Sequence, residues 1–338
     1  MLLRADLDLT MKEDIAVLED EVTELVAKLG QMKTEIHKVV VGQEEVVDQL
    51  IIGMLASGHI LIEGLPGLAK TLMIKSLARA VSLDFNRIQF TPDLMPTDIL
   101  GTELIEQDES GHKTFKYNKG PVFTNILLAD EINRTPPKTQ AALLEVMQEY
   151  KVTYAGNDYR LDQPFFLLAT QNPIEQSGTF PLPEAQVDRF LLYVLIDYPS
   201  ANEEEEILRM TTGKKGEEMQ AVLTGEEIVR LQELTREVFI SDDLISKISE
   251  FVRSTRPVNV TKGMVADYVD FGAGPRAGQA VIMAAKGHAL MNGRYSVTPD
   301  DIKAVILPSL RHRILLNFKA ESERLTTDTL LSHLLEKF

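Results

Sequence analysis

The sequence predicts an α/β protein with a five-stranded parallel sheet between helices, followed by an all-helical second domain. Five continuous apolar runs alternate with helical patterns, which is typical of strands buried on both faces of a sheet. A glycine-rich turn joins the first of these runs to a helical pattern. The apolar strand-like runs end near Pro199, and from there to the end the sequence shows helical patterns and helix caps.

Composition narrows the class of protein before any motif is considered. The 338 residues suggest about two domains. The net charge of -16, from 35 Lys and Arg against 51 Asp and Glu, disfavours unspecific binding to nucleic acid or anionic membranes, which needs a basic surface. With no cysteine there is no disulfide or thiolate metal site, and no apolar run is long enough for a membrane span. The acidic start does not resemble a signal peptide, so we expect a cytoplasmic protein.

The N-terminal segment, residues 1–35, contains apolar residues at alternating spacings of three and four. This spacing fits either a short coiled coil or an amphipathic helix lying on the next domain, and the second interpretation is favoured. A further helix is expected from Glu44 to about Ala56. The spaced residues are Ile15, Leu18, Val22, Leu25, Leu29, Met32 and Ile36.

The stretch Gly64–Thr71 has the context of a phosphate-binding loop, because it follows the apolar run 60–62 and precedes a helical pattern. Such a turn surrounds phosphates with backbone N–H groups, and the following helix N-terminus adds partial positive charge. Lys70 would reach the β- and γ-phosphates, and the Thr71 hydroxyl would bind Mg²⁺. Ala69 stands where the usual pattern has glycine, so an ordinary strand-to-helix turn is the alternative.

The remaining strands follow at 86–90, 125–131, 165–169 and 191–196. Two hairpins are expected as inserts, one near 102–118 with a turn at Asp108–Gly111 and one near 150–163 with Gly156 and Asn157 as its turn. These elements place residues 36–200 in the first domain.

Asp130 and Glu131 end the third apolar strand. There Asp130 can hold the hydration shell of Mg²⁺, and Glu131 can act as the general base that polarises the attacking water. A strand that simply ends in a charged loop is the alternative. The order of the two motifs along the chain favours the nucleotide interpretation.

Three further polar residues lie at positions where chemistry is expected. Asn172 follows the fourth strand and could orient the lytic water, although turn residues often follow strands. Arg189 precedes the fifth strand and could be either a structural ion pair near Asp188 or an arginine finger for a neighbouring subunit. Arg276 follows Gly274-Pro275 at the start of a helix, where the turn would present it to the nucleotide from above.

The second domain, residues 201–338, is predicted from its helix signals. Ser200 and Glu203 form a capping box, which places the acidic run Glu203–Glu206 in a first turn where acids are favourable. The other signals are caps at Thr224, Ser241 and Thr298, and an amphipathic last helix from Leu330 to Phe338.

Together these motifs resemble the MoxR family of AAA+ ATPases, over about residues 35–335. In that family the phosphate loop commonly reads G-x-P-G-x-A-K-T, so Ala69 fits the resemblance. The segments that carry it are Gly64–Thr71, Leu128–Arg134, Ala169–Pro173, Phe180–Phe190 and Gly274–Ala277.

The resemblance implies an AAA+ core with a helical lid, a ring that is usually a hexamer, and ATP bound with Mg²⁺ between subunits. It assigns Walker A to Gly64–Thr71, Walker B to Asp130 and Glu131, sensor 1 to Asn172, the arginine finger to Arg189 and sensor 2 to Arg276. Both hairpins would face the pore of the ring. The implied nucleotide-binding residues are Val41, Gly42, Gly64, Pro66, Gly67, Leu68, Ala69, Lys70, Thr71, Leu72 and Asp130, and Gln89 is the candidate partner that silences Glu131.

The expected activity is hydrolysis of ATP to ADP and phosphate by a chaperone that remodels partner proteins. Proteins with von Willebrand factor A domains are candidate partners. The alternatives are a motor subunit of a metal chelatase, a nucleic-acid motor and a processive unfoldase. The acidic turn at Asp108 and Glu109 argues against a strand-tracking groove, which should be basic. The flanking aromatics Phe115, Tyr117, Tyr154 and Tyr159 are interpreted as packing rather than grip.

Overall fold

The computed structural model describes residues 21–107, 113–173, 178–213, 218–336 and 338. Its centre is a five-stranded sheet in the order β2-β5-β8-β1-β9, in which every neighbouring pair is parallel. This confirms the predicted class and all five predicted strands. Their bounds are Ile60–Gly64 for β1, Phe85–Gln89 for β2, Ile126–Asp130 for β5, Phe166–Gln171 for β8 and Leu192–Ile196 for β9.

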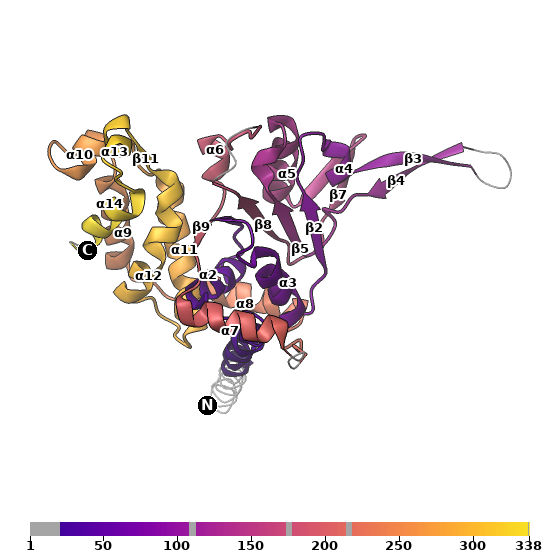
Figure 1. Cartoon of the computed structure of the whole chain (residues 1–338), viewed down its shortest axis with the longest axis horizontal. Coiled ribbons are helices and arrows are strands. Elements are labelled where there is room, and N and C mark those ends of the chain that lie inside the picture. Colours follow the sequence, from indigo (N-terminus) through magenta and orange to yellow (C-terminus); the bar gives the residue numbers. More distant parts are fainter. Residues whose placement is uncertain (1–20, 108–112, 174–177, 214–217, 337) are drawn as a thin grey trace, which may run out of the picture.

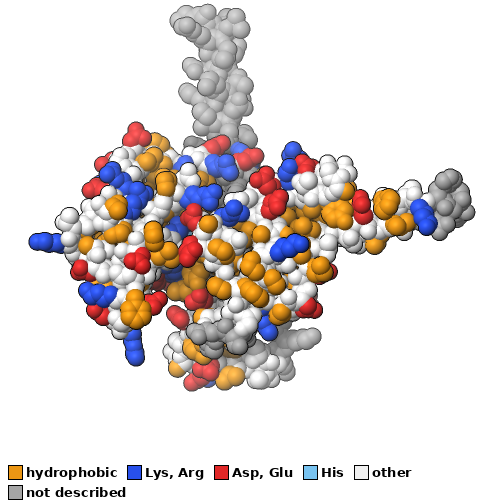
Figure 2. Space-filling view, turned by 90° about the horizontal axis from the view of Figure 1, so that it is seen from above, with side chains coloured by type: hydrophobic (Ala, Val, Ile, Leu, Met, Phe, Trp, Pro, Cys, Tyr) orange, Lys and Arg blue, Asp and Glu red, His pale blue; other side chains and the backbone are white. Residues whose placement is uncertain are grey.

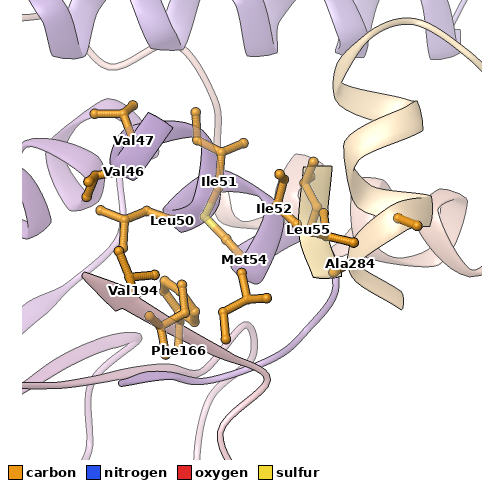
Figure 3. Close-up of a cluster of buried hydrophobic side chains, with 14 of the residues drawn as sticks. Val46, Val47, Leu50, Ile51, Ile52, Met54, Leu55, Phe166, Val194 and Ala284 are labelled. Carbon is orange, nitrogen blue, oxygen red and sulfur yellow. The ribbon is translucent and has the colours of Figure 1, made fainter. Parts of the chain in front are cut away.

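Helices cover both faces of this sheet because successive strand residues point to opposite sides. In β5, Leu128 packs into the core formed with α2 (Glu44–Leu55) and α3 (Lys70–Ala80), whereas Leu127 packs with α5 (Pro137–Glu149) on the other face. Figure 3 shows the first of these cores, where the side chains of α2 lie against Phe166 and Val194 of the sheet and beside Ala284 of the second domain. One helix thus joins the sheet to the lid.

The N-terminal segment is helical over residues 21–37. Its seam residues, from Val22 to Ile36, are at most 5% exposed and belong to the same core as α2. The segment therefore lies on the adjoining domain, as predicted, over its described part. Ile15 and Leu18 lie outside the described residues.

Both predicted hairpins are present. The first pairs β3 (Gly101–Gln107) with β4 (Lys113–Lys119) after a short helix, α4 (Pro96–Leu100), and projects from the body of the molecule (Figure 1). Its predicted turn lies outside the described residues. The second pairs β6 (Lys151–Tyr154) with β7 (Asn157–Arg160). Its turn was predicted one residue too late, since Ala155 and Gly156 are the two turn residues, with φ of 49° and 82°.

Stacked tyrosines connect the two hairpins. The ring of Tyr117 stacks on that of Tyr159 at a centroid distance of 4.2 Å and lies 5.2 Å from that of Tyr154. These three aromatics are packing residues, as predicted. Phe115 is not, because 70% of it is exposed on the projecting arm.

The second domain is helical, with one short antiparallel pair, β10 (Val269–Phe271) and β11 (Leu315–Leu316), that the sequence did not reveal. The side chains of Ser200, Thr224 and Ser241 cap helices as predicted, and Thr298 forms a capping box with Asp301. No helix within the described ranges has the length and apolar composition to cross a membrane. The helices are α7 (Ala201–Thr212), α8 (Gly225–Glu237), α9 (Asp242–Ser254), α10 (Met264–Tyr268), α11 (Pro275–Met291), α12 (Pro299–Leu310), α13 (Phe318–Ser322) and α14 (Thr327–Leu335).

Candidate nucleotide site

The predicted phosphate loop connects β1 to α3 at the carboxyl edge of the sheet. Gly67 and Ala69 both have positive φ, 84° and 55°. The alanine therefore adopts the left-handed conformation for which glycine is normally used. No side chain caps α3, so its first-turn N–H groups are available to phosphate oxygens.

Lys70 is the first residue of α3, and its Nζ donates a 2.6 Å hydrogen bond to the carbonyl oxygen of Gly64 at the other end of the loop. Burial lowers the pKa of Lys70, and the charges of Asp130 and Glu131 oppose this by raising it. The strand order β5-β8-β1 brings the end of β5, with its two acids, to the same sheet edge as the loop. The loop and the acidic pair thus lie at one edge of the sheet.

A small apolar cavity of about 120 Å³ adjoins the loop. Val41, Leu68 and Leu72 line it together with Ile207 and Met210 from α7 of the lid. A purine ring needs such an apolar slot beside its phosphates. Gly42 is not among the residues that line this cavity, although its neighbours Val41 and Gln43 are. It packs closely against α7, because a Cβ at Gly42 would lie 2.0 Å from Oε1 of Glu203 in the capping box of that helix.

Asp130 is buried at the end of β5, and both of its carboxylate oxygens have donors. Oδ1 accepts from the Thr170 hydroxyl at 2.5 Å, and Oδ2 accepts from Nε and Nη2 of Arg87 at 2.9 and 2.6 Å. Thr170 lies on the adjacent strand β8, and its Oγ1 also accepts from the backbone N–H of Glu131. Side chains of the two neighbouring strands, β2 and β8, therefore fix the position of this carboxylate.

Glu131 follows in the left-handed conformation, with φ of 57°, which turns its side chain away from that of Asp130. Its Oε2 accepts from Nε2 of Gln89 at 2.6 Å and from Nη1 of Arg134 at 2.9 Å. The predicted partner Gln89 is in contact with Glu131. In this conformation the carboxylate is held by protein donors.

Asn172 is almost fully buried immediately after β8, the strand between β5 and β1. The carboxyl ends of parallel strands meet at one edge of the sheet. This edge therefore carries the loop, the acidic pair and Asn172.

Arg189 and Arg276 lie elsewhere. Both line a cavity of about 320 Å³ together with residues 57–59, which precede β1. The five residues of β1 span about 16 Å between this end and the phosphate loop. The turn before α11 thus places Arg276 at the opposite end of the sheet from the phosphate loop of its own chain.

Asp188 anchors this second region. It pairs with Arg313 at 2.8 Å and with Arg276 at 3.6 Å. Arg189 is exposed, and in the part of the chain that the structure describes no acidic side chain pairs with it. The ion-pair alternative for Arg189 therefore applies to Arg313 instead.

The sequence analysis assigned no individual role to Arg87, Thr170 or Arg134. A basic residue inside the strand 86–90 was the available signal for Arg87, and a hydroxyl at the end of β8 was the signal for Thr170. Arg134 follows Glu131 by three residues, a spacing that brings side chains together only because residues 132–134 form a helical turn, Ile132–Arg134.

A divalent cation would be held mainly by phosphate oxygens and water at this site. Among the described residues no three His, Cys, Asp or Glu side chains form a metal cluster. Thr71 and Asp130 supply hydroxyl and carboxylate oxygens, the donors that Mg²⁺ prefers when it keeps several waters. These residues fit Mg²⁺ bound together with a nucleotide.

Comparisons with known proteins agree with this geometry. Residues 59–192 match the model of the ATPase family associated with various cellular activities (AAA), and residues 262–334 match the AAA lid domain. Chaperone MoxR1 of Mycobacterium tuberculosis is 43% identical over 89% of this chain and 79% of its own length. The chain belongs to the MoxR family of AAA+ ATPases.

Two further relatives extend over nearly the whole chain. The uncharacterised protein YeaC of Bacillus subtilis is 39% identical over 91% of this chain and 93% of its own. The crystal structure of a candidate ATPase from Cytophaga hutchinsonii superposes with a TM-score of 0.89 at 42% identity, covering 96% of this MoxR-family chain and 98% of the other. The core and lid described above are thus those of an AAA+ ATPase.

Proposed function

We propose that this MoxR-family protein hydrolyses ATP to ADP and phosphate with Mg²⁺, and that the hydrolysis drives the remodelling of partner proteins. The observation that carries the proposal is that Lys70, Asp130 and Glu131 lie at one edge of the sheet, at the ends of β1 and β5. Bound Mg²⁺ would neutralise phosphate charge, and the oxygens of Thr71 and Asp130 would hold its waters.

The chain's own groups supply the remaining chemistry. Lys70 leaves Gly64 to contact the β- and γ-phosphates, and Glu131 removes a proton from the attacking water. Asn172, buried beside them, orients that water. Each group acts through a position fixed by the end of a strand or the start of a helix.

We further propose that the site is completed by a neighbouring subunit. The transferring phosphate needs a cation, but Arg189 lies about one strand length from the loop of its own chain. Arg276 lies beside it and is oriented by Asp188. A head-to-tail contact would bring both arginines of one subunit to the nucleotide of the next, and repetition of this contact closes a ring, which we expect to be a hexamer.

The projecting hairpin is the proposed contact with the partner protein. Ile105 and Phe115 are opposite each other in its register, and both are largely exposed. Figure 2 shows hydrophobic side chains along this arm. Our candidate partner is a protein with a von Willebrand factor A domain. It would bind the exposed apolar side chains of this hairpin, in a complex that we expect in the cytoplasm.

A nucleic-acid motor is the competing function. The acidic turn that argued against it lies outside the described residues, and the described stem carries exposed Lys113, Lys116 and Lys119. The net charge of -16 still opposes unspecific binding to nucleic acid. Stimulation of hydrolysis by DNA or RNA would favour this alternative over protein remodelling.

The test of the proposed activity is phosphate release by the purified protein. We expect hydrolysis with MgCl₂ and none with EDTA. Lys70→Ala should lose ATP binding in calorimetry, and Glu131→Gln should keep ATP binding while hydrolysis falls by about a hundredfold or more. ATP binding by Lys70→Ala with wild-type affinity would overturn the assignment of the loop.

A further inference from the structure

Arg87 contacts Asp130 directly and is linked to Glu131 through Gln89. We infer that Arg87 is a positioning residue that couples metal binding at Asp130 to the release of Glu131. The inference rests on the proposed ATPase function and adds a mode of regulation to it. It comes from a continuous chain of hydrogen bonds across the ends of β2 and β5.

The chain of contacts begins at Asp130. Arg87 directs Nε and Nη2 to the same oxygen, Oδ2, at 2.9 and 2.6 Å. Its Nη2 also donates to Oε1 of Gln89 at 2.6 Å, and Nε2 of Gln89 donates to Oε2 of Glu131. One guanidinium group therefore contacts Asp130 and fixes the amide that holds Glu131.

The strand arrangement explains why these contacts occur together. Arg87 and Gln89 are two residues apart in β2, so they share one face of the strand. The register pairs Gln89 with Asp130 across the β2–β5 ladder. Because β2 is an edge strand, nothing in the sheet covers its outer side, and 45% of the Arg87 side chain is exposed. Arg87 can therefore swing into solvent without disturbing the core.

Metal binding would break this chain at a defined place. The Thr170 hydroxyl occupies Oδ1 of Asp130, so Oδ2 is the oxygen left for the waters of Mg²⁺, and Arg87 occupies it. A divalent cation and a guanidinium repel each other at one carboxylate oxygen. Mg²⁺ bound with the nucleotide would lower the time that Arg87 spends on Oδ2. Gln89 would then lose the donor to its carbonyl for part of the time, and Glu131 would be freed more often to reach the water.

Competition at Oδ2 makes a measurable prediction for Mg²⁺-dependent affinity. The probe is AMPPNP, titrated by calorimetry in excess EDTA and in excess MgCl₂. The quantity compared is the dissociation constant in EDTA divided by the dissociation constant in MgCl₂. In Arg87→Gln the competing cation is gone, so we expect this ratio to rise about tenfold above wild type. Arg87→Lys keeps a charge but only one donor group, so its ratio should lie between the two.

Three controls make the result specific. Arg79→Gln removes an exposed arginine that pairs with Glu218 and should leave the ratio unchanged. Lys70→Ala should lose AMPPNP in both buffers. Thermal unfolding of each variant verifies that it is folded.

The relay to Glu131 is tested separately through ATP turnover with saturating Mg²⁺. If Arg87 acts through Gln89, Arg87→Gln should raise kcat in the wild-type background, because Glu131 is released more easily. The same substitution should leave kcat unchanged in a Gln89→Ala background. Equal effects in both backgrounds would overturn the relay. A ratio in Arg87→Gln within about twofold of wild type would overturn the competition. If the wild-type protein bound AMPPNP in neither buffer, the proposed ATPase function would be refuted together with the role of Arg87. Normal binding by wild type with an unchanged ratio in Arg87→Gln would refute the role of Arg87 alone.

Discussion

Nε2 of Gln89 donates a 2.6 Å hydrogen bond to Oε2 of Glu131, so the proposed general base is held by the neighbouring strand. Gln89→Ala removes this donor and leaves the hydrogen bond from Arg134 to the carboxylate. We expect basal ATP turnover to rise about fivefold with ATP affinity unchanged, because one such bond contributes about 1 kcal/mol. Steady-state phosphate release checks this.

Asn86→Ala is the matched control for that variant. Asn86 lies on the same strand but donates to the carbonyl oxygen of Pro121, remote from Glu131. Its turnover should equal that of wild type. A tenfold loss of turnover in Gln89→Ala with ATP still bound would show that Gln89 supports catalysis rather than restraining it.

Most of the core and its site were predictable because they depend on short-range patterns. Buried strands and the turn between residues 64 and 71 are local, and parallel strands bring their ends together whatever the loops do. The position of Arg276 was not predictable, because it depends on how α11 packs on α2 and on the ion pair with Asp188, a residue 88 positions earlier. Arg87 was missed for the same reason, since its partner Asp130 is 43 residues away.

Ala69 provides a test of the loop conformation. At φ of 55°, a left-handed alanine costs roughly 1 kcal/mol, and glycine removes that strain while making the unfolded chain more flexible. Ala69→Gly should therefore keep both stability and ATP affinity. Ala69→Val, with a β-branched side chain at the same φ, should lose about 2 kcal/mol of unfolding free energy and most of its ATP affinity. Equal ATP affinity in the alanine and valine proteins would contradict this conformation.

His59 makes the stability of the core sensitive to pH. Burial lowers its pKa from 6.5 to about 4, which the hydrogen bond from its ring to the carbonyl oxygen of Met147 only partly offsets. Below pH 6.5 the unfolded chain therefore binds a proton that the folded chain does not. The unfolding free energy should fall by about 3 kcal/mol from this residue between pH 6.5 and 4.

Urea unfolding across that pH range measures the effect. His59→Gln starts with lower stability at pH 7 but should lose less on acidification than wild type does. His333→Gln, which changes a partly exposed histidine paired with Glu336, should keep the wild-type slope. Parallel pH profiles for wild type and His59→Gln would refute the buried neutral histidine.

Asp301 is the charged centre of the lid. It is fully buried, and although burial alone would raise its pKa, hydrogen bonds from Arg294, Thr298 and His288 lower the pKa well below its usual range. The ionised Asp301 carboxylate therefore stabilises the folded lid at any pH above the ordinary aspartate pKa. This stabilisation is lost as the pH falls through the lowered pKa that Asp301 has in the folded protein. At pH 7, Asp301→Asn should cost about 3 kcal/mol, because it leaves Arg294 without its counter-charge.

The adjacent exposed residue Asp300 provides the control. Asp300→Asn should change the urea midpoint little, since exposed first-turn acids contribute less than about 1 kcal/mol. A midpoint for Asp301→Asn equal to that of Asp300→Asn would show that the buried network does not stabilise the lid.

The central claim is that one subunit's Arg189 completes the site of the next, and mixing two inactive variants tests it most directly. Arg189→Ala keeps Glu131, and Glu131→Gln keeps Arg189, so each lacks hydrolysis alone. A mixture of these two variants is assayed for phosphate release. The control mixture combines the Arg189→Ala/Glu131→Gln double variant with Glu131→Gln, so that no subunit in it carries Glu131. Fluorescence transfer between labelled subunits first verifies that subunits exchange in both mixtures. We predict that the mixture regains activity while the control does not. No activity at any mixing ratio would contradict the account.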